Sequence, residues 1–112
     1  MSSKKMVKLI ALYKKPEDVA SFEDNYFNSH IPLASKMPGL KKVEISKVNG
    51  APGGEAEYYL MAELYFEDMD SLKAAMSSPE GKAAAKNLMG FAKDIVSMMF
   101  ADVIEEKALA QV

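Results

Sequence analysis

The chain has 112 residues, of which 49% are hydrophobic and 27% charged, with no cysteine and a net charge of -2. This length fits one domain of ordinary globular composition. The missing cysteine excludes disulfides and cysteine nucleophiles, and the slight acidity argues against a nucleic-acid partner. We expect no signal peptide and no membrane span. The prediction is one cytoplasmic domain over 1–112, with a core at 6–105 and a tail at 106–112.

The first half of the chain predicts a strand followed by a long helix. Residues 6–13 are rich in branched and aromatic side chains, as in a strand. Pro16 and the two acidic residues after it are typical of a helix start. Apolar residues then recur at steps of three or four up to residue 37, which places His30, the only histidine, on the buried stripe. Pro32 is expected to kink this helix and free the carbonyl of Asn28.

The middle of the chain predicts two strands joined by a loop. Residues 41–48 alternate in the manner of an edge strand, and the glycine- and proline-rich stretch 49–57 predicts an exposed loop. Residues 58–66 form the clearest strand, and one of its faces is uniformly apolar. The other face resembles the lining of a pocket and consists of Tyr59, Met61, Glu63 and Tyr65.

The last part of the chain predicts a broken helix and a fourth strand. Ser78-Pro79-Glu80 offers a second helix start after a break near Ser77, and residues 97–104 suit a strand. The resulting order, βαββαβ, predicts a ferredoxin-like α+β fold with an antiparallel four-stranded sheet. The helices would cover one face of this sheet and leave an apolar patch on the other. We therefore expect a homodimer, which would cover that patch.

Several motifs occur in an order that resembles a known family. They are Tyr13-Lys14-Lys15-Pro16, Phe22, Tyr26, His30-Ile31-Pro32-Leu33-Ala34, Met37-Pro38-Gly39-Leu40 and Ser78-Pro79-Glu80-Gly81-Lys82. Together they resemble the EthD-like family (ethyl tert-butyl ether degradation) of the dimeric α+β barrel superfamily, over about residues 6–105. The resemblance implies a homodimer that forms a dimeric α+β barrel, and a pocket between sheet and helices with a histidine at its mouth.

His30 is the candidate catalytic residue, because histidine exchanges protons near neutral pH. The candidate ligand-binding residues are Tyr13, Tyr26, Tyr59, Met61, Glu63 and Tyr65. In the competing interpretation His30 is a neutral core residue beside the kink, and Glu63 is an interface carboxylate paired with a lysine. The residues alone favour the packing role for His30, whereas the family resemblance favours the catalytic role.

No cofactor and no metal are predicted. A single histidine and no cysteine argue against haem, and the missing ligand cluster argues against zinc. We expect a protein of catabolism that binds an apolar or aromatic metabolite. Two functions remain open: cofactor-independent acid–base catalysis through His30, for which the resemblance implies a monooxygenase, decarboxylase, cyclase or isomerase, and binding or delivery of a degradation intermediate without catalysis.

Overall fold

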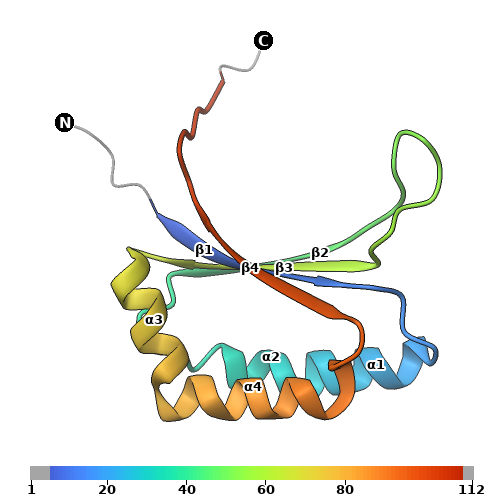
Figure 1. The fold of residues 1–112 in the computed structure, drawn as a ribbon, viewed down its shortest axis with the longest axis horizontal. Helices are drawn as coiled ribbons and strands as arrows, with labels where there is room; N and C mark the ends of the chain where they lie inside the picture. The colour runs from blue at the N-terminus through green and yellow to red at the C-terminus, as the bar shows by residue number, and fades with distance from the viewer. Residues whose placement is uncertain (1–5, 110–112) are drawn as a thin grey trace.

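The structure is a computed structural model that describes residues 6–109. Its elements are β1 (Val7–Tyr13), α1 (Val19–Asn25), η1 (Tyr26–His30), α2 (Ile31–Ala34), β2 (Lys42–Lys47), β3 (Leu60–Phe66), α3 (Met69–Ser77), α4 (Pro79–Ala92) and β4 (Val96–Asp102). The strands form one antiparallel sheet in the order β2-β3-β1-β4, and the helices all lie on one side of it (Figure 1). This is the predicted ferredoxin-like α+β arrangement.

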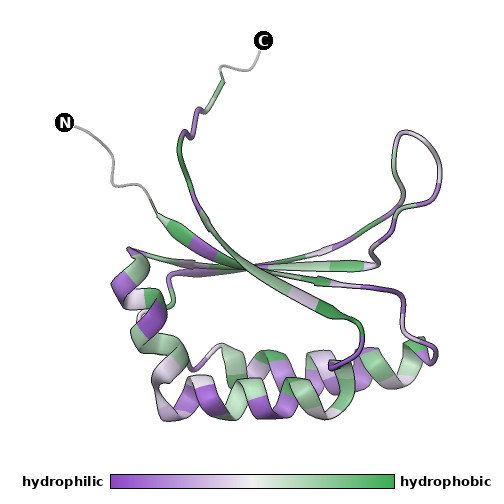
Figure 2. Cartoon of the chain, in the orientation of Figure 1, coloured by the Kyte–Doolittle hydropathy of each residue, from purple (hydrophilic) through white to green (hydrophobic). Residues whose placement is uncertain are grey.

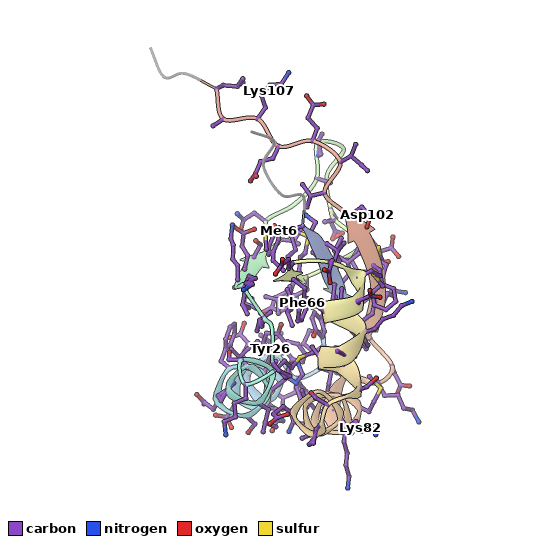
Figure 3. The ribbon with its side chains drawn as sticks, turned by 90° about the vertical axis from the view of Figure 1, so that its left-hand side faces the viewer. Met6, Tyr26, Phe66, Lys82, Asp102 and Lys107 are labelled. Atoms are coloured by element: carbon purple, nitrogen blue, oxygen red, sulfur yellow. The ribbon has the colours of Figure 1, made fainter. Side chains whose placement is uncertain are left out.

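The core lies between the sheet and the helices. The two central strands, β1 and β3, bury every second residue on the helix side, as the alternation of side chains in a strand requires. Leu9 pairs with Leu64 and Ala11 with Ala62, so these side chains share that face. Figure 3 shows Tyr26 on the side of its helix that faces the sheet and Lys82 pointing away from the sheet.

The open face of the sheet is more mixed than the sequence predicts. Ile10 lies beside Met99 and Leu12 beside Met61, which gives an apolar area on β1, β3 and β4. Next to this area, Lys8 forms an ion pair with Glu63, with 2.6 Å between nitrogen and oxygen. The open face therefore combines an apolar area with a partly buried ion pair.

Helix starts follow side-chain caps. The first helix was predicted to begin at Pro16, but it begins at Val19. Asp18 caps it by accepting a hydrogen bond from the amide of Ser21 at 3.0 Å. The predicted break near Ser77 is confirmed: Ser78 ends α3 and caps α4 by accepting from the amide of Gly81 at 3.0 Å.

The disturbance predicted from Pro32 takes the form of a π-helical turn, η1. Here the amide of Ile31 donates to the carbonyl of Tyr26, five residues earlier. A wider turn gives the proline ring room, since in a regular α-helix it would crowd the carbonyl of Asn28. The helix continues through this turn as α2 and ends at Ala34, three residues before the predicted position.

The third strand starts at Leu60, two residues later than predicted. The chain bends at Tyr59, whose amide donates to the carbonyl of Tyr13 at 2.7 Å. This bend interrupts the alternation, and the Tyr59 hydroxyl donates to the carboxylate of Glu23 on α1. Tyr59 therefore packs beside α1 rather than with Met61, Glu63 and Tyr65.

Hydropathy follows the layers of the fold. Hydrophilic residues are concentrated on the outer surfaces of the helices and in the loops (Figure 2).

Within residues 6–109, no helix combines the length and the apolar character needed to span a membrane. The predicted fourth strand is present, but it runs over Val96–Asp102 rather than 97–104. The last residues of the predicted tail, 110–112, lie outside the described part of the chain.

Candidate functional site

A cavity of about 90 Å³ lies between the helix side of the sheet and the helices. Its floor includes Ala11 and Ala62, which pair directly across β1 and β3 and leave room because their side chains are small. The cavity is lined by Leu9, Ala11, Tyr13, Tyr26, His30, Ile31, Ala34, Ser35, Met37, Val43, Ala62, Leu64, Met76, Gly81, Ala84, Ala85, Leu88 and Met98. Gly81 contributes only backbone to this lining. The other side chains are apolar apart from those of Ser35 and His30 and the hydroxyl groups of Tyr13 and Tyr26.

An aromatic cluster fixes His30 at this cavity. The π-helical turn places Tyr26 and His30 at its two ends, with their rings 5.5 Å apart. Tyr26 packs edge-on against Tyr13 of β1 at 5.1 Å, and Phe91 of α4 lies 6.3 Å from the imidazole. His30 is 8% exposed, so the imidazole is almost fully removed from solvent.

Three buried polar atoms in this region form no hydrogen bond of good geometry within residues 6–109, although the Tyr13 hydroxyl lies near Tyr26 and the Asn87 side chain lies near His30. They are the Tyr26 hydroxyl, Nδ1 of His30 and Oδ1 of Asn87. Buried polar atoms are almost always paired, since leaving one unpaired costs roughly 1–3 kcal/mol. Two of these atoms belong to residues that line the cavity, so a ligand there could satisfy them.

Burial keeps the side chains of His30, Tyr26 and Tyr13 in their neutral forms. The pKa of His30 is lowered from its usual 6.5, mainly because burial disfavours the imidazolium; the nearby Asn87 side chain and Ala84 carbonyl oppose this effect. Burial also raises the pKa of Tyr26 to about 12, and the pKa of Tyr13 is raised for the same reason. At neutral pH the site therefore offers an uncharged imidazole and protonated phenols.

The structure brings only part of the predicted site together. Tyr13, Tyr26 and His30 all line the cavity. Met61, Glu63 and Tyr65 lie on the opposite face of the sheet, where Glu63 pairs with Lys8 rather than approaching His30. The amino groups of Lys8 and Lys42 lie 5.3 Å and 4.9 Å from the centre of the Tyr65 ring.

Two residues of α4 that lie beside His30 were not predicted as part of the site. Asn87 places its side chain near the imidazole, and the Phe91 ring packs against it. Asn87 lies on the helix three residues after Ala84 and four before Phe91, so it belongs to the inward stripe. A single polar residue within an apolar stripe was the signal that could have identified it. Within residues 6–109, no three histidine, cysteine or acidic side chains converge on a possible metal position.

The fold and this cavity define a ferredoxin-like α+β protein with a partly open site between sheet and helices. The sequence model of the EthD domain matches residues 14–102. The chain therefore belongs to the EthD domain family.

Individual proteins resemble this chain in sequence or in fold. The crystal structure of an EthD family protein from Bacillus halodurans is 46% identical, covers 91% of this chain and 99% of its own, and superimposes with a TM-score of 0.84. An uncharacterized 11.0 kDa protein from the thcB-thcC intergenic region of Rhodococcus erythropolis is 34% identical over 97 residues, 87% of this chain and 94% of that protein. Hydroxynitrile lyase from Passiflora edulis shares the fold at 14% identity, with a TM-score of 0.74 over 95% of this chain and 100% of its own.

Proposed function

We propose that this protein binds a small, mostly apolar or aromatic molecule in the cavity beside His30 and exchanges a proton with it. The observation that carries the proposal is the pair of unpartnered polar atoms, the Tyr26 hydroxyl and Nδ1 of His30, on residues that line an otherwise apolar cavity. A ligand with one polar group could satisfy both atoms while its remaining surface contacts the apolar lining.

The chemistry follows from the protonation states. An uncharged imidazole can act as a general base toward an acidic C–H or O–H group of the ligand. The Tyr26 hydroxyl retains its proton and can donate to an oxygen on which negative charge develops. Proton transfer of this kind requires no cofactor and is common to decarboxylation, cyclisation, isomerisation and the activation of an aromatic hydroxyl for oxygenation.

Two further observations support an enzymatic role. The π-helical turn that contains His30 is a feature often found at functional sites. The hydroxynitrile lyase that shares this fold is an enzyme, and we extend to the present chain only the idea that such a scaffold can host catalysis.

The test compares turnover and ligand affinity for wild type and His30→Ala, with Ser29→Ala as the matched control. Ser29 is an exposed neighbour on the same π-helical turn. We expect His30→Ala to lower the rate at least ~100-fold while ligand binding weakens only several-fold through the lost hydrogen bond, and Ser29→Ala to behave as wild type. Binding without turnover across lactone, phenolic and β-keto acid substrates would instead leave a binding or delivery protein.

The open face of the sheet belongs to the same proposal. We propose that a second copy of the chain covers the apolar area around Ile10, Leu12 and Met99 to form a homodimer. The loop between β2 and β3 and the segment after β4 both extend beyond the sheet on the side opposite the helices, where they would flank the second copy (Figure 1).

A further inference from the structure

The cavity beside His30 differs from the other concave surfaces of the molecule in its charge. Within the described part of the chain, none of its lining residues is Lys, Arg, Asp or Glu. By contrast, the open groove of about 470 Å³ between the start of α1 and the end of α4 includes both lysines and carboxylates in its lining. The groove beside the β2–β3 loop also carries a lysine and two glutamates.

The polar groups in the cavity are also uncharged. His30 is neutral at physiological pH because it is buried, and the hydroxyls of Tyr13 and Tyr26 keep their protons. A charged ligand would lose its hydration on entering this space and would meet no opposite charge there. Burial of an ion without a counter-charge is strongly unfavourable, whereas burial of a neutral group that gains a hydrogen bond is not.

Tyr26 and His30 can together form hydrogen bonds with one hydroxyl or carbonyl group of a ligand. The Tyr26 hydroxyl can donate to a carbonyl or hydroxyl oxygen, and Nδ1 of His30 can accept from a hydroxyl or donate in its other tautomer. Methionines complete the apolar part of the lining, and two of them, Met76 and Met98, are also exposed at the surface. Because methionine side chains are flexible, this part can adapt to ligands of different shape while the polar end stays fixed.

We infer that the cavity selects ligands that are uncharged and carry one hydroxyl or carbonyl oxygen at the end that meets Tyr26 and His30. This inference rests on the proposed binding function and narrows its ligand class, because it excludes carboxylates, phosphates and amines. It therefore also removes decarboxylation, whose substrate is a carboxylate, from the reactions considered above. The same argument applies to the product: a product that carries a charge would be bound less well in this cavity and would leave it more readily.

The test uses probe molecules of matched shape. Ethylbenzene, benzyl alcohol and benzylammonium differ only in the last group of the side chain, and acetophenone differs from benzoate in the same way. At about pH 7.5 the amine and the acid are ionised. Binding can be followed by NMR through the ring signals of His30, which are unambiguous because the chain has a single histidine.

We expect benzyl alcohol and acetophenone to bind at least ~10-fold more tightly than benzylammonium and benzoate. Tyr26→Phe should weaken benzyl alcohol binding several-fold and leave ethylbenzene binding unchanged. A preference of less than ~10-fold over either ion, or an equal effect of Tyr26→Phe on both probes, would overturn the inference while the binding function stands. If no probe shifts the His30 signals, the proposed binding function fails together with the inference.

Discussion

The Tyr26 hydroxyl lies near that of Tyr13 but forms no hydrogen bond of good geometry with it. The Tyr26 side chain is 0% exposed, and within residues 6–109 the hydroxyl forms no hydrogen bond. Removal of an unpaired buried polar atom relieves its desolvation cost. We expect Tyr26→Phe to raise the free energy of unfolding by about 1 kcal/mol in urea titrations, although it should weaken ligand binding.

A second tyrosine provides the matched control for this experiment. The Tyr59 hydroxyl does have a partner, the carboxylate of Glu23, so Tyr59→Phe removes a hydrogen bond. That variant should lose up to about 1 kcal/mol of stability rather than gain it. Destabilisation by Tyr26→Phe to the same extent would mean that its hydroxyl contributes to the fold.

His30 gives the protein a stability that depends on pH. Its pKa in the folded chain lies below the unfolded value of 6.5, because burial disfavours the charged imidazole. Above pH 6.5 both states hold a neutral imidazole, and stability from this group is fully present. As the pH falls from 6.5 toward the lower folded-state pKa, the unfolded chain binds the proton more readily and stability declines.

The prediction is a decline in wild-type stability below pH 6.5 that is weaker in His30→Gln. Urea titrations at several pH values measure it, and the difference between the two proteins removes the contribution of the carboxylates. A direct NMR titration of the single histidine should give a midpoint below 6.5. A midpoint above that value would contradict the burial argument.

At the scale of single elements, helix α4 contains two glycines in opposite situations. A methyl group on Gly81 would collide with the carbonyl oxygen of Ala75 and crowd that of Met76, because α3 turns sharply into α4 at this point. A methyl group on Gly90 would meet no atom within 4 Å. The first glycine is required by the corner between the two helices, whereas the second only lowers helix propensity.

We therefore expect Gly81→Ala to lower the free energy of unfolding by about 2 kcal/mol or more, since the carbonyls cannot move away without disturbing α3. On the same helix, Gly90→Ala should raise it by roughly 0.5–1 kcal/mol. Thermal or urea unfolding measures both variants. Equal effects of the two substitutions would show that the corner is more adaptable than its geometry indicates.

Sequence periodicity predicted the elements well, because local patterns determine most of them. The strand at Val7–Tyr13 and the break between α3 and α4 follow from alternation and from the Ser78-Pro79 signal, and both are observed. The start of α1 was wrong by three residues, since the choice between Pro16 and Asp18 depends on which side chain reaches a free amide.

The site was harder to predict than the fold, because side-chain partners come from distant elements. His30, Tyr13 and Tyr26 line one cavity, and their catalytic or ligand-binding roles stay predictions. Alternation alone placed Tyr59 beside Met61, but a bend at residue 59 interrupts the strand pattern and directs Tyr59 to Glu23. Asn87 stood out in the sequence as a polar residue within the apolar stripe of α4, but its place beside His30 followed only from how α4 packs against the π-helical turn.

At the scale of the whole molecule, the open sheet face determines the expected assembly. Wild type should have the mass of a dimer at micromolar concentration by light scattering. Met99 is 42% exposed on the open face, and Met89 is 38% exposed on α4. A carboxylate at Met99 would lie within the proposed interface, so Met99→Glu should shift the protein toward monomer, whereas Met89→Glu should remain dimeric.

A wild-type mass equal to that of one chain would contradict this assembly. If Met99→Glu and Met89→Glu gave the same mass, the contact would lie elsewhere on the molecule. The Lys8–Glu63 ion pair is already partly buried in the single chain, and its mutual charge compensation would allow it to lie within such an interface.

The paired alanines on the helix side of the sheet have an evolutionary consequence. Ala11 and Ala62 face each other at the centre of the core, where strands usually place larger branched residues. Each methylene group left out forgoes about 0.8 kcal/mol of burial. A single base change from alanine to valine in either codon would begin to fill the cavity and make the protein more stable. One mutation is therefore enough to reduce the empty space. Its size could therefore change among related chains by two carbon atoms at a time, without any change to His30.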